Sequence, residues 1–486
     1  MRYINPIEMR ALDINSSYFG VGLDVLMDNA GRAVFESIQK IEGLKNKRIA
    51  FFCGLGNNGG DGFVAAAYLR RDGYKPRIYL VGKKGDVKTR EARNALALLE
   101  ETGARIQEVS KPGEPEYQVD IIVDALLGIG LKGEPKEPLK GIIKRINDSG
   151  AYVVSVDVPS GLGTRTLVKS SLVIALHAAK EGLKGYKTII VDIGIPEKAQ
   201  AYAGPGDLIV NLTRKPESHK GDNGRVMVVS GSDEYSGAPV LAGLGALYSG
   251  SDLVTLFVPQ AILDSARTFL PDFIVRGYEG SRLNPGAVKD ILDFSKNQDA
   301  CVIGPGLGMH PETKEAVNSL LSKMKLPVVI DADALKQLDP KALKRMNAVV
   351  TPHATEFSML TGERISGTLE EKAAFIAKWA KRLSTNILFK SHVDVIASPE
   401  GRIRLNDTGN SGMTVGGTGD VLAGMVASFI AQGMKPFPAA CCAAFVNGAA
   451  GDALYRFKGY GYTASDVAGE IPYTIKRFID MYGQES

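Results

Sequence analysis

The chain has few cysteines and no long apolar run. Its 486 residues include four cysteines, Cys53, Cys301, Cys441 and Cys442, and no two of them stand in a C-x-x-C spacing. A disulfide scaffold and a zinc site are therefore not expected, whereas buried free thiols are. No apolar run reaches the roughly 20 residues of a membrane span, and the first residues mix charges, unlike a signal peptide. We expect a cytoplasmic protein without a signal peptide or a membrane anchor.

The chain also lacks an excess of charge of either sign. Its 58 lysines and arginines stand against 54 aspartates and glutamates, and 44% of its residues are hydrophobic. This balance gives no electrostatic footprint for nucleic acid or for an anionic membrane. The expected partner is a small molecule, with no nucleic acid and no membrane.

A chain of this length is expected to form more than one domain. Strand-like apolar runs alternate with helical patterns, such as a strand and turn at 47–56 after a helix at 23–40, and this order predicts mainly parallel sheets flanked by helices. Charged and turn-forming residues interrupt the alternation at 211–224, and a fresh strand follows. The sequence therefore predicts two α/β domains, at residues 1–210 and 211–486.

A glycine-rich stretch, GLGNNGGDGF at 54–63, follows the first predicted strand and precedes a helix. In a dinucleotide site, such a turn offers N–H groups to phosphate, and an acidic residue at the end of the next strand binds the ribose. Here the next strand ends in Lys83 and Lys84, which disfavours an ordinary NAD(P) site. The amides and carboxylate of residues 57–61 suit a cation or polar ligand groups, and turn formation with helix capping by Asp61 is the structural alternative.

Two later strands also end in polar residues. Asp124 ends one strand before another glycine loop, and Asp157 and Ser160 follow the next strand in SVDVPSG. The carboxyl ends of parallel strands converge on one crevice. We therefore expect these residues to lie near the first glycine turn.

The motifs LMDNAG, GNNGGDG, VDALLGIGLKGE and SVDVPSG, in this order, resemble those of the NAD(P)H-hydrate epimerase family. The resemblance implies a Rossmann-like domain with Asp157 as acid/base, and a potassium ion held by Asn58, Asp124 and Ser160, whose hard oxygen atoms suit such a cation. Contacts with hydrated NADH or NADPH are implied for two segments, Asn57, Asn58, Gly59, Gly60 and Asp61, and Gly128, Ile129, Gly130, Leu131, Lys132, Gly133 and Glu134. The sequence departs from the family at Ile129, where Thr is common, and after the PSG turn, where an acidic stretch is shortened.

A second glycine turn, at Gly416, Gly417 and Gly419, stands directly before Asp420 and a helix. Its N–H groups can bind a phosphoryl group while the carboxylate acts as base for an accepting hydroxyl. A helix cap is the structural alternative for Asp420.

This turn resembles the ribokinase-like superfamily, and the stretches IGPGLG, VVIDADAL, TPHATEF and NDTGNSGMTVGGTGDVLAG resemble its ADP- or ATP-dependent NAD(P)H-hydrate dehydratases. The resemblance implies contacts with the hydrated nucleotide from Ala238, Gly306, His353 and Asp420. It implies contacts with the phosphate donor from Lys390, Ser391, His392, Val393 and Asp394, and from Gly416, Gly417 and Gly419.

Two acidic residues in this half need separate comment. Glu356 stands where ribokinase-like enzymes have the acidic residue that organises magnesium; a helix-start glutamate is the alternative, as a packed strand-end histidine is for His353. In KSHVDVI, family members usually have Gly after the Lys and Thr in place of Asp394. A carboxylate near a polyphosphate is unfavourable unless a metal or Lys390 offsets it.

The resemblances cover nearly the whole chain and imply a bifunctional enzyme that epimerises hydrated NAD(P)H and dehydrates its S form. The expected cofactors are potassium in the first domain and magnesium with ADP or ATP in the second. The expected partners are hydrated NADH and NADPH, ADP or ATP, and further copies of the chain in a homo-oligomer. The alternative is a ribokinase-like kinase of a vitamin precursor fused to a non-catalytic Rossmann-like binding module.

Overall fold

The computed structural model describes residues 3–131 and 133–483 and divides the chain into two compact units, Met1–Gln200 and Ala201–Ser486. The division comes before the expected boundary between residues 210 and 211 because the intervening segment packs within the second unit. Tyr202 forms a β-bridge with Leu405, and Arg404 forms an ion pair with Asp207 at 2.8 Å. Lys132, one of the expected contact residues, lies outside the described residues.

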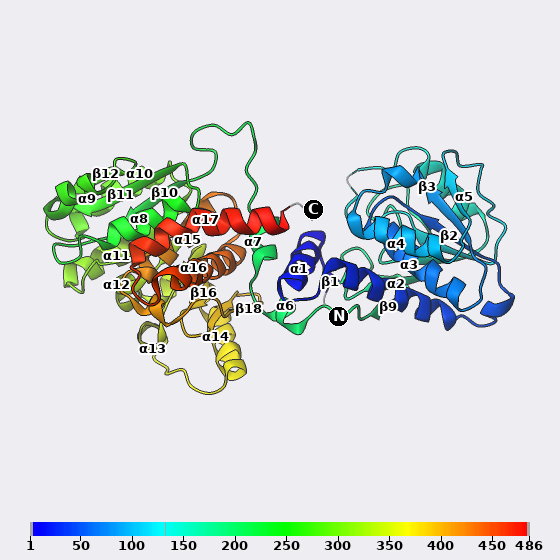
Figure 1. Ribbon diagram of the computed structural model, residues 1–486. Coiled ribbons are helices and arrows are strands. Elements are labelled where there is room, and N and C mark those ends of the chain that lie inside the picture. The colour runs from blue at the N-terminus through cyan, green and yellow to red at the C-terminus, as the bar shows by residue number, and fades with distance from the viewer. Residues whose placement is uncertain (1–2, 132, 484–486) are drawn as a thin grey trace. The chain divides into compact units, whose positions relative to one another are not determined.

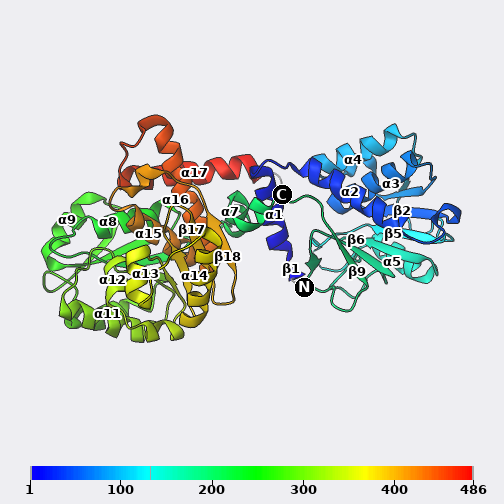
Figure 2. The same ribbon diagram turned by 90° about the horizontal axis from the view of Figure 1, so that it is seen from below.

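The first unit is built on a seven-stranded parallel sheet with the order β4-β3-β2-β5-β6-β7-β9 (Figures 1 and 2). The strands are β2 (Ile49–Cys53), β3 (Arg77–Val81), β4 (Ile106–Val109), β5 (Ile121–Ala125), β6 (Tyr152–Val156), β7 (Leu172–Leu176) and β9 (Thr188–Val191). A separate parallel pair joins β1 (Tyr3–Ile4) to β8 (Ala179–Lys180).

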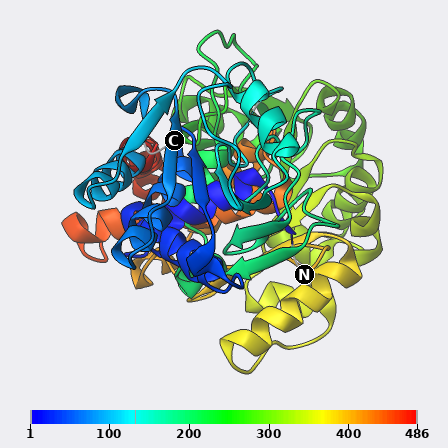
Figure 3. The same cartoon turned by 90° about the vertical axis from the view of Figure 1, so that its right-hand side faces the viewer.

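Helices cover both faces of this sheet, which appears in blue to teal in Figure 3. The helices of this unit are α1 (Pro6–Tyr18), α2 (Leu23–Gln39), α3 (Asn57–Arg71), α4 (Arg90–Glu101), α5 (Leu139–Asp148) and α6 (Glu197–Ala201), and the faces are covered by α2 to α5. The side chains of β2 alternate between the faces: Phe51 packs in the core formed with α2, α3 and α4, and Phe52 packs in the core formed with α5. The helix expected at 23–40 and the strand expected after Lys47 are thus confirmed, and a buried strand with both faces covered explains the continuous apolar run.

The second unit is a nine-stranded sheet with the order β12-β11-β10-β13-β14-β15-β16-β17-β18. It is mainly parallel, as expected, and only β17 and β18 run antiparallel to their neighbours. The strands are β10 (Arg225–Val229), β11 (Leu253–Pro259), β12 (Ile274–Tyr278), β13 (Ala300–Ile303), β14 (Val328–Ile330), β15 (Ala348–Val350), β16 (Asn386–Phe389), β17 (Asp394–Ala397) and β18 (Ile403–Asn406).

Two groups of helices cover this second sheet. One face packs against α10 (Val288–Ser295), α11 (Pro311–Lys323), α12 (Ala332–Gln337), α13 (Ala354–Thr361) and α14 (Leu369–Leu383). The remaining helices are α7 (Pro205–Asn211), α8 (Ala238–Tyr248), α9 (Leu263–Phe269), α15 (Thr418–Ala431), α16 (Pro436–Lys458) and α17 (Ala464–Tyr482). Figure 2 shows α16 and α17 on one side of this unit and α11 to α14 on the other.

Helix α16 is the one described helix long and apolar enough to cross a membrane by length and composition. Within its most apolar window, 83% is buried inside the protein, which is how a core helix passes the same test. It carries Cys441 and Cys442, and all four cysteines are buried and unpaired, as expected.

Two candidate active sites

In each main sheet the strand order reverses at the strand that comes first in the sequence. In the first unit β2 lies between β3 and β5, and in the second unit β10 lies between β11 and β13. Open parallel sheets bind ligands at such a switch point, outside the carboxyl ends of the strands. The predicted residues of each site lie on the segments that follow these strand ends.

The first glycine-rich stretch forms a tight turn and then the start of a helix. Helix α3 begins at Asn57 with Gly56 at its N-cap, so residues 57–61 are its first turns rather than a loop. A Cβ atom at Gly54 would lie 1.9 Å from the carbonyl oxygen of Leu126, and one at Gly59 would lie 2.0 Å from that of Gly54. These two glycines are therefore required for close approach of the backbone. Asp61 is not the cap; its side chain is buried.

Asp124 and Ser160 lie in direct contact at the end of β5. The fully buried carboxylate of Asp124 accepts hydrogen bonds from Ser160 N at 2.9 Å, from Ser160 Oγ at 2.5 Å and from Ser155 Oγ at 2.8 Å. Burial raises the pKa of Asp124, although these hydrogen bonds lower it. Both polar side-chain atoms of buried Asn58 have no hydrogen-bond partner among the described residues. An unpartnered buried amide is costly, so Asn58 is available to a ligand such as the expected potassium ion, whose binding remains a prediction.

Asp157 follows β6 directly and adopts a left-handed backbone with φ of 63°. Its Oδ1 accepts a hydrogen bond from Leu176 N at 3.2 Å and forms an ion pair with Lys180 Nζ. Left-handed backbone is costly for a residue with a Cβ and is concentrated at functional sites. The candidate acid/base is thus held by the end of the neighbouring strand β7.

Two further carboxyl groups influence this region. Burial, with added repulsion from Asp157, raises the pKa of Asp13, on α1, to about 7. Burial, with added repulsion from Asp157 and Asp13, raises the pKa of Asp61 well above its ordinary value. In both cases the charge of Lys180 acts in the opposite direction. The site therefore combines several buried carboxyl groups with one buried ammonium.

The loop after β5 carries the second set of expected contacts. Ile129 packs against apolar side chains of the core, and Glu134 Oε1 accepts a hydrogen bond from Arg165 N at 2.8 Å. A Cβ atom at Gly130 or Gly133 would meet nothing within 4 Å, so this part of the loop is open. The shortened segment after the PSG turn is thus tied to this loop through Glu134.

In the second unit, the glycine turn leads into α15. Gly417 is the N-cap with φ of 96°, and Asp420 lies in the first helical turn, so Asp420 is not the cap. A Cβ atom at Gly416 would meet nothing within 4 Å. Burial, with added repulsion from Asp331, raises the pKa of Asp420 to about 7, although the charge of Lys390 acts in the opposite direction. A carboxyl group that titrates near neutrality is suited to general base catalysis.

A buried ion pair lies beneath this turn. Asp331, which follows β14 and is 1% exposed, accepts hydrogen bonds on Oδ1 from Lys390 Nζ at 2.7 Å and from Thr351 Oγ1 at 2.7 Å. Burial lowers the pKa of Lys390, but the charges of Asp331 and Glu356 outweigh it and raise this pKa above its ordinary value. A Cβ atom at Gly419 would lie 3.3 Å from Lys390 Nζ. The expected donor-binding lysine is therefore close to the turn but bound to Asp331.

His353 and Glu356 begin α13 together. His353 is the N-cap and its Nδ1 accepts from Thr355 N at 3.1 Å, while Glu356 Oε2 accepts from His353 N at 2.9 Å. Glu356 is thus a capping residue, as the structural alternative held, and its Oε2 also lies 3.9 Å from Lys390 Nζ. A role in magnesium binding remains a prediction.

Two other expected contacts meet on one wall of the site. Gly306 follows β13 with φ of 61°, and a Cβ atom there would lie 2.9 Å from Cβ of Ala238, the first residue of α8. The end of β13 therefore approaches the start of α8 closely, and glycine at position 306 is required for this approach.

The turn between β16 and β17 contains residues 391–393, and Ser391 and His392 are exposed. Asp394 accepts hydrogen bonds from Ser391 N and from Asn406 Nδ2, each at 3.0 Å. Burial raises its pKa to about 6. This carboxyl group therefore organises the turn, and it titrates closer to neutrality than an ordinary aspartate.

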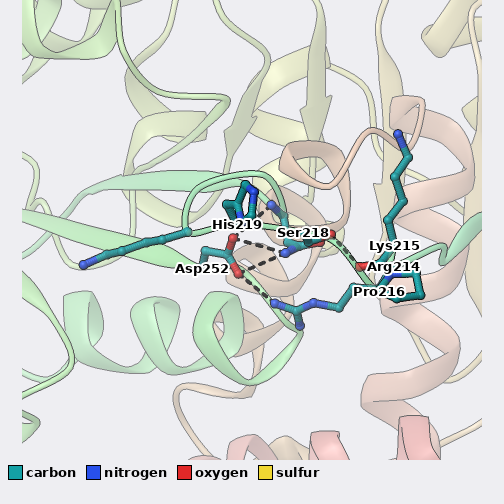
Figure 4. Close-up of a pocket in the computed structure, with 8 residues that line it drawn as sticks. Arg214, Lys215, Pro216, Ser218, His219 and Asp252 are labelled. Atoms are coloured by element: carbon teal, nitrogen blue, oxygen red, sulfur yellow. Dashed lines mark hydrogen bonds and ion pairs between the residues drawn. The ribbon is translucent and has the colours of Figure 1, made fainter.

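A cavity of about 470 Å³ lies elsewhere in the second unit, beside the segment that precedes β10 (Figure 4). Arg214 Nη2 contacts Asp252 at 2.7 Å, and the Lys215 side chain points away from that carboxylate. Because Asp252 precedes β11, the cavity is at the amino ends of the strands, opposite the edge that carries Asp331.

Comparison with known proteins shows the family to which the chain belongs. Residues 226–473 match the family described as NAD(P)H-hydrate dehydratase, and residues 23–182 match the YjeF-related protein N-terminus. The bifunctional NAD(P)H-hydrate repair enzyme Nnr of Archaeoglobus fulgidus is 40% identical over 490 residues, which cover 98% of this chain and 99% of that protein. The chain belongs to the bifunctional NAD(P)H-hydrate repair enzymes. The family resemblances expected from the motifs are confirmed, and so is a chain with an epimerase and a dehydratase domain.

Other members of this repair family and one solved structure agree. The Nnr protein of Methanothermobacter thermautotrophicus is 38% identical over 493 residues, which cover 96% of this chain and 94% of that protein. The ADP/ATP-dependent NAD(P)H-hydrate dehydratase of Bacillus subtilis, co-crystallised with ATP and Mg²⁺, matches with a TM-score of 0.51 and 30% identity. That match covers 57% of this chain and 98% of that one, which supports the ribokinase-like fold of the second unit.

Three charged residues of these repair-family sites were not predicted from the sequence: Lys180, Asp13 and Asp331. Asp331 could have been found, because a carboxylate directly after a buried strand is the same signal that singled out Asp124 and Asp157. Lys180 and Asp13 carried no such signal, and Asp13 precedes the residues matched by the first family.

Proposed function

We propose that the protein restores hydrated NADH and NADPH, with Asp157 acting in epimerisation and Asp420 in dehydration. The observation that carries this proposal is the pair of aspartates, Asp157 buried and Asp420 half-buried, each at the carboxyl edge of its own sheet in a chain of the repair family. Hydration at C6 of the reduced nicotinamide ring gives two epimers and destroys the hydride donor. Two activities on one chain leave neither epimer stranded.

The second unit would dehydrate the S form. Asp420 takes the proton of the C6 hydroxyl, whose oxygen attacks the terminal phosphoryl group of ADP or ATP, and AMP or ADP leaves. Phosphate then departs with the electron pair of its bond to C6, and loss of a proton from C5 forms the C5–C6 double bond. Phosphorylation thus converts hydroxide into a good leaving group. The N–H groups of residues 416–419 and the ammonium of Lys390 would bind the transferred phosphoryl group.

Magnesium would enter this unit with the nucleotide. Among the described residues no group of three or more metal-binding side chains is assembled, which suits an ion held mainly by phosphate oxygens and water. Glu356 and Asp331, whose carboxylates both lie within 4 Å of Lys390 Nζ, are the candidates to orient the water molecules bound to this ion. The ion would neutralise charge that develops on the phosphates.

The first unit would interconvert the R and S forms. Asp157 takes the proton of the C6 hydroxyl as the bond between C6 and the ring nitrogen opens, and the nitrogen takes up a proton with that electron pair. Closure on the opposite face reverses both transfers and inverts C6. Potassium held by Asn58, Asp124 and Ser160 would contribute positive charge at the site.

The proposed location of the protein is the cytoplasm, and its proposed assembly is a homo-oligomer. The four unpaired cysteines support a reducing compartment.

The test is recovery of the near-ultraviolet absorbance of NADH from an R/S mixture of hydrated NADH, with potassium, magnesium and either ADP or ATP. Full recovery with phosphate release would support both activities and identify the donor. Recovery of the S fraction alone would leave the first unit without epimerase activity. A stable phosphorylated product instead of free phosphate would support a kinase and contradict the proposal.

A further inference from the structure

Lys180 is the most unusual charged residue of the first unit. It is 2% exposed and lies on the short strand β8, outside every motif that marked the site. Burial of an ammonium group is strongly unfavourable unless the group is paired and hydrogen-bonded. Interactions with neighbouring groups must therefore offset the cost of burying the Lys180 ammonium group.

Lys180 contacts both Asp157 and Leu176, the residue whose N–H also binds Asp157. Its Nζ forms an ion pair with Asp157 Oδ1 and donates a hydrogen bond to the carbonyl oxygen of Leu176. The N–H of Leu176 donates to the same Oδ1 at 3.2 Å. Oδ1 is thus held from two directions, whereas Oδ2 has no hydrogen-bond partner in the described part of the chain. One oxygen is anchored, and the other is available to a substrate.

Strained backbone surrounds this contact. Asp157 and His177 follow the adjacent strands β6 and β7, and both are left-handed, with φ of 63° and 65°. Such residues are costly and persist only where the surrounding structure holds them. The ion pair with Lys180 is one of the interactions that hold Asp157 in this conformation.

The backbone of Lys180 is itself fixed from outside the main sheet. In the parallel pair of β1 and β8, Ile4 stands opposite Lys180, and Glu181 N donates to Ile4 O at 3.1 Å. Besides Lys180, the titratable groups that act on this region are Asp13 on α1, Asp61 on α3 and His177 after β7. Lys180 is the one ammonium that the described residues set against these carboxyl groups.

We propose that Lys180 is a positioning residue for epimerisation, which anchors Oδ1 of Asp157 and supplies the compensating positive charge, so that Oδ2 can exchange a proton with the hydrated ring. This inference rests on the proposed epimerase function. It assigns Lys180 no contact with the substrate and no covalent step.

The test compares Lys180→Ala with wild type and with Lys184→Ala, which removes an exposed lysine four residues later. Consumption of R-hydrate is measured after the S form is exhausted, with methylammonium or tetramethylammonium added. We expect Lys180→Ala to slow R-form consumption about 100-fold, with S-form dehydration unchanged and Lys184→Ala like wild type. Methylammonium, which can donate hydrogen bonds from the vacated space, should restore at least about tenfold of the loss, and tetramethylammonium should not.

The outcomes separate the two proposals. If wild type fails to consume the R form, the proposed epimerase function is wrong. If wild type is active and Lys180→Ala stays within about threefold of it, the positioning role is wrong. Lost activity that methylammonium does not restore, in a variant whose first unit melts as wild type does, would also overturn it. If Lys180→Ala does not fold, Lys180→Met supplies similar volume without charge, and full R-form activity of that variant would overturn the role.

Discussion

Asp157 and Asp420 stand at the carboxyl edges of two mainly parallel sheets, yet the lysine of the first site pairs with Asp157 itself, whereas the lysine of the second site pairs with another carboxylate. Asp157 is paired with a buried lysine that contacts it directly. Asp420 is surrounded by Asp331, Asp333 and Glu356, and the lysine nearest to it is bound to Asp331.

This difference matches the proton transfers that each unit is proposed to perform. In epimerisation the carboxylate must give back the proton it takes, because the two forms of the hydrate differ only in the configuration of one carbon. A fixed geometry with a compensating charge suits such an exchange. In dehydration the base acts in one direction, and a pKa near 7, produced by burial and neighbouring carboxylates, makes Asp420 a stronger proton acceptor than an ordinary aspartate.

We expect the largest effect from a substitution at Asp420 in the second unit. Asp420→Asn removes the proposed base and should lower NADH recovery from either epimer about 1000-fold or more. Epimer exchange should continue, because the first unit is unchanged. Recovery is followed by absorbance, and exchange by chromatographic separation of the R and S forms after adding pure S-hydrate. Recovery at the wild-type rate would remove Asp420 from the mechanism.

Asp157→Asn removes the proposed acid/base of the first unit, with a smaller expected effect. R-form consumption should fall about 100-fold, toward the uncatalysed rate, and S-form consumption should not change. The measurement is the slow phase of NADH recovery from an R/S mixture. An unchanged slow phase would mean that another group performs the exchange, and Asp61 would be the next residue to replace.

Asp331→Asn tests how neighbouring charges set the pKa of Asp420, and it removes neither proposed base. In wild type, kcat/KM for the S-hydrate should rise with pH, with a midpoint near pH 7 and a plateau about one unit above it, as Asp420 loses its proton. Asp331→Asn removes a negative charge near Asp420 and releases Lys390 from its ion pair, and both changes favour the ionised form of Asp420. The midpoint of the profile should therefore move to lower pH, by on the order of one unit. A midpoint that stays in place, or moves upward, would contradict the assigned electrostatics.

The sequence was sufficient for the fold class and for part of each site. Alternating strands and helices predicted two parallel α/β units, and polar residues directly after apolar strands located Asp124, Asp157 and Ser160. Glycine at 54 and 59 was less informative, since a tight backbone approach requires it there whether or not a phosphate binds. Lys180 could not be predicted, because its contact with Asp157 depends on the pairing of β8 with β1, which no local pattern encodes. Asp13 reaches the site only through the placement of α1.

The smallest expected effect concerns the stability of the first unit. In the folded chain burial raises the pKa of Asp13 to about 7, whereas in the unfolded chain it ionises near its usual value of 3.8. Between about pH 4 and pH 7 the unfolded state therefore binds fewer protons, so this residue lowers the free energy of unfolding as pH rises through that window. Asp13→Asn removes the penalty, and its Tm should fall less than that of wild type between pH 5 and pH 8, by on the order of a few degrees. Glu42→Gln, which neutralises an exposed carboxylate, serves as the matched control and should follow wild type. If the transition of the first unit shifts equally in all three proteins, Asp13 is ionised in the folded chain, and Lys180 must balance one more negative charge than the arrangement around Asp157 now implies.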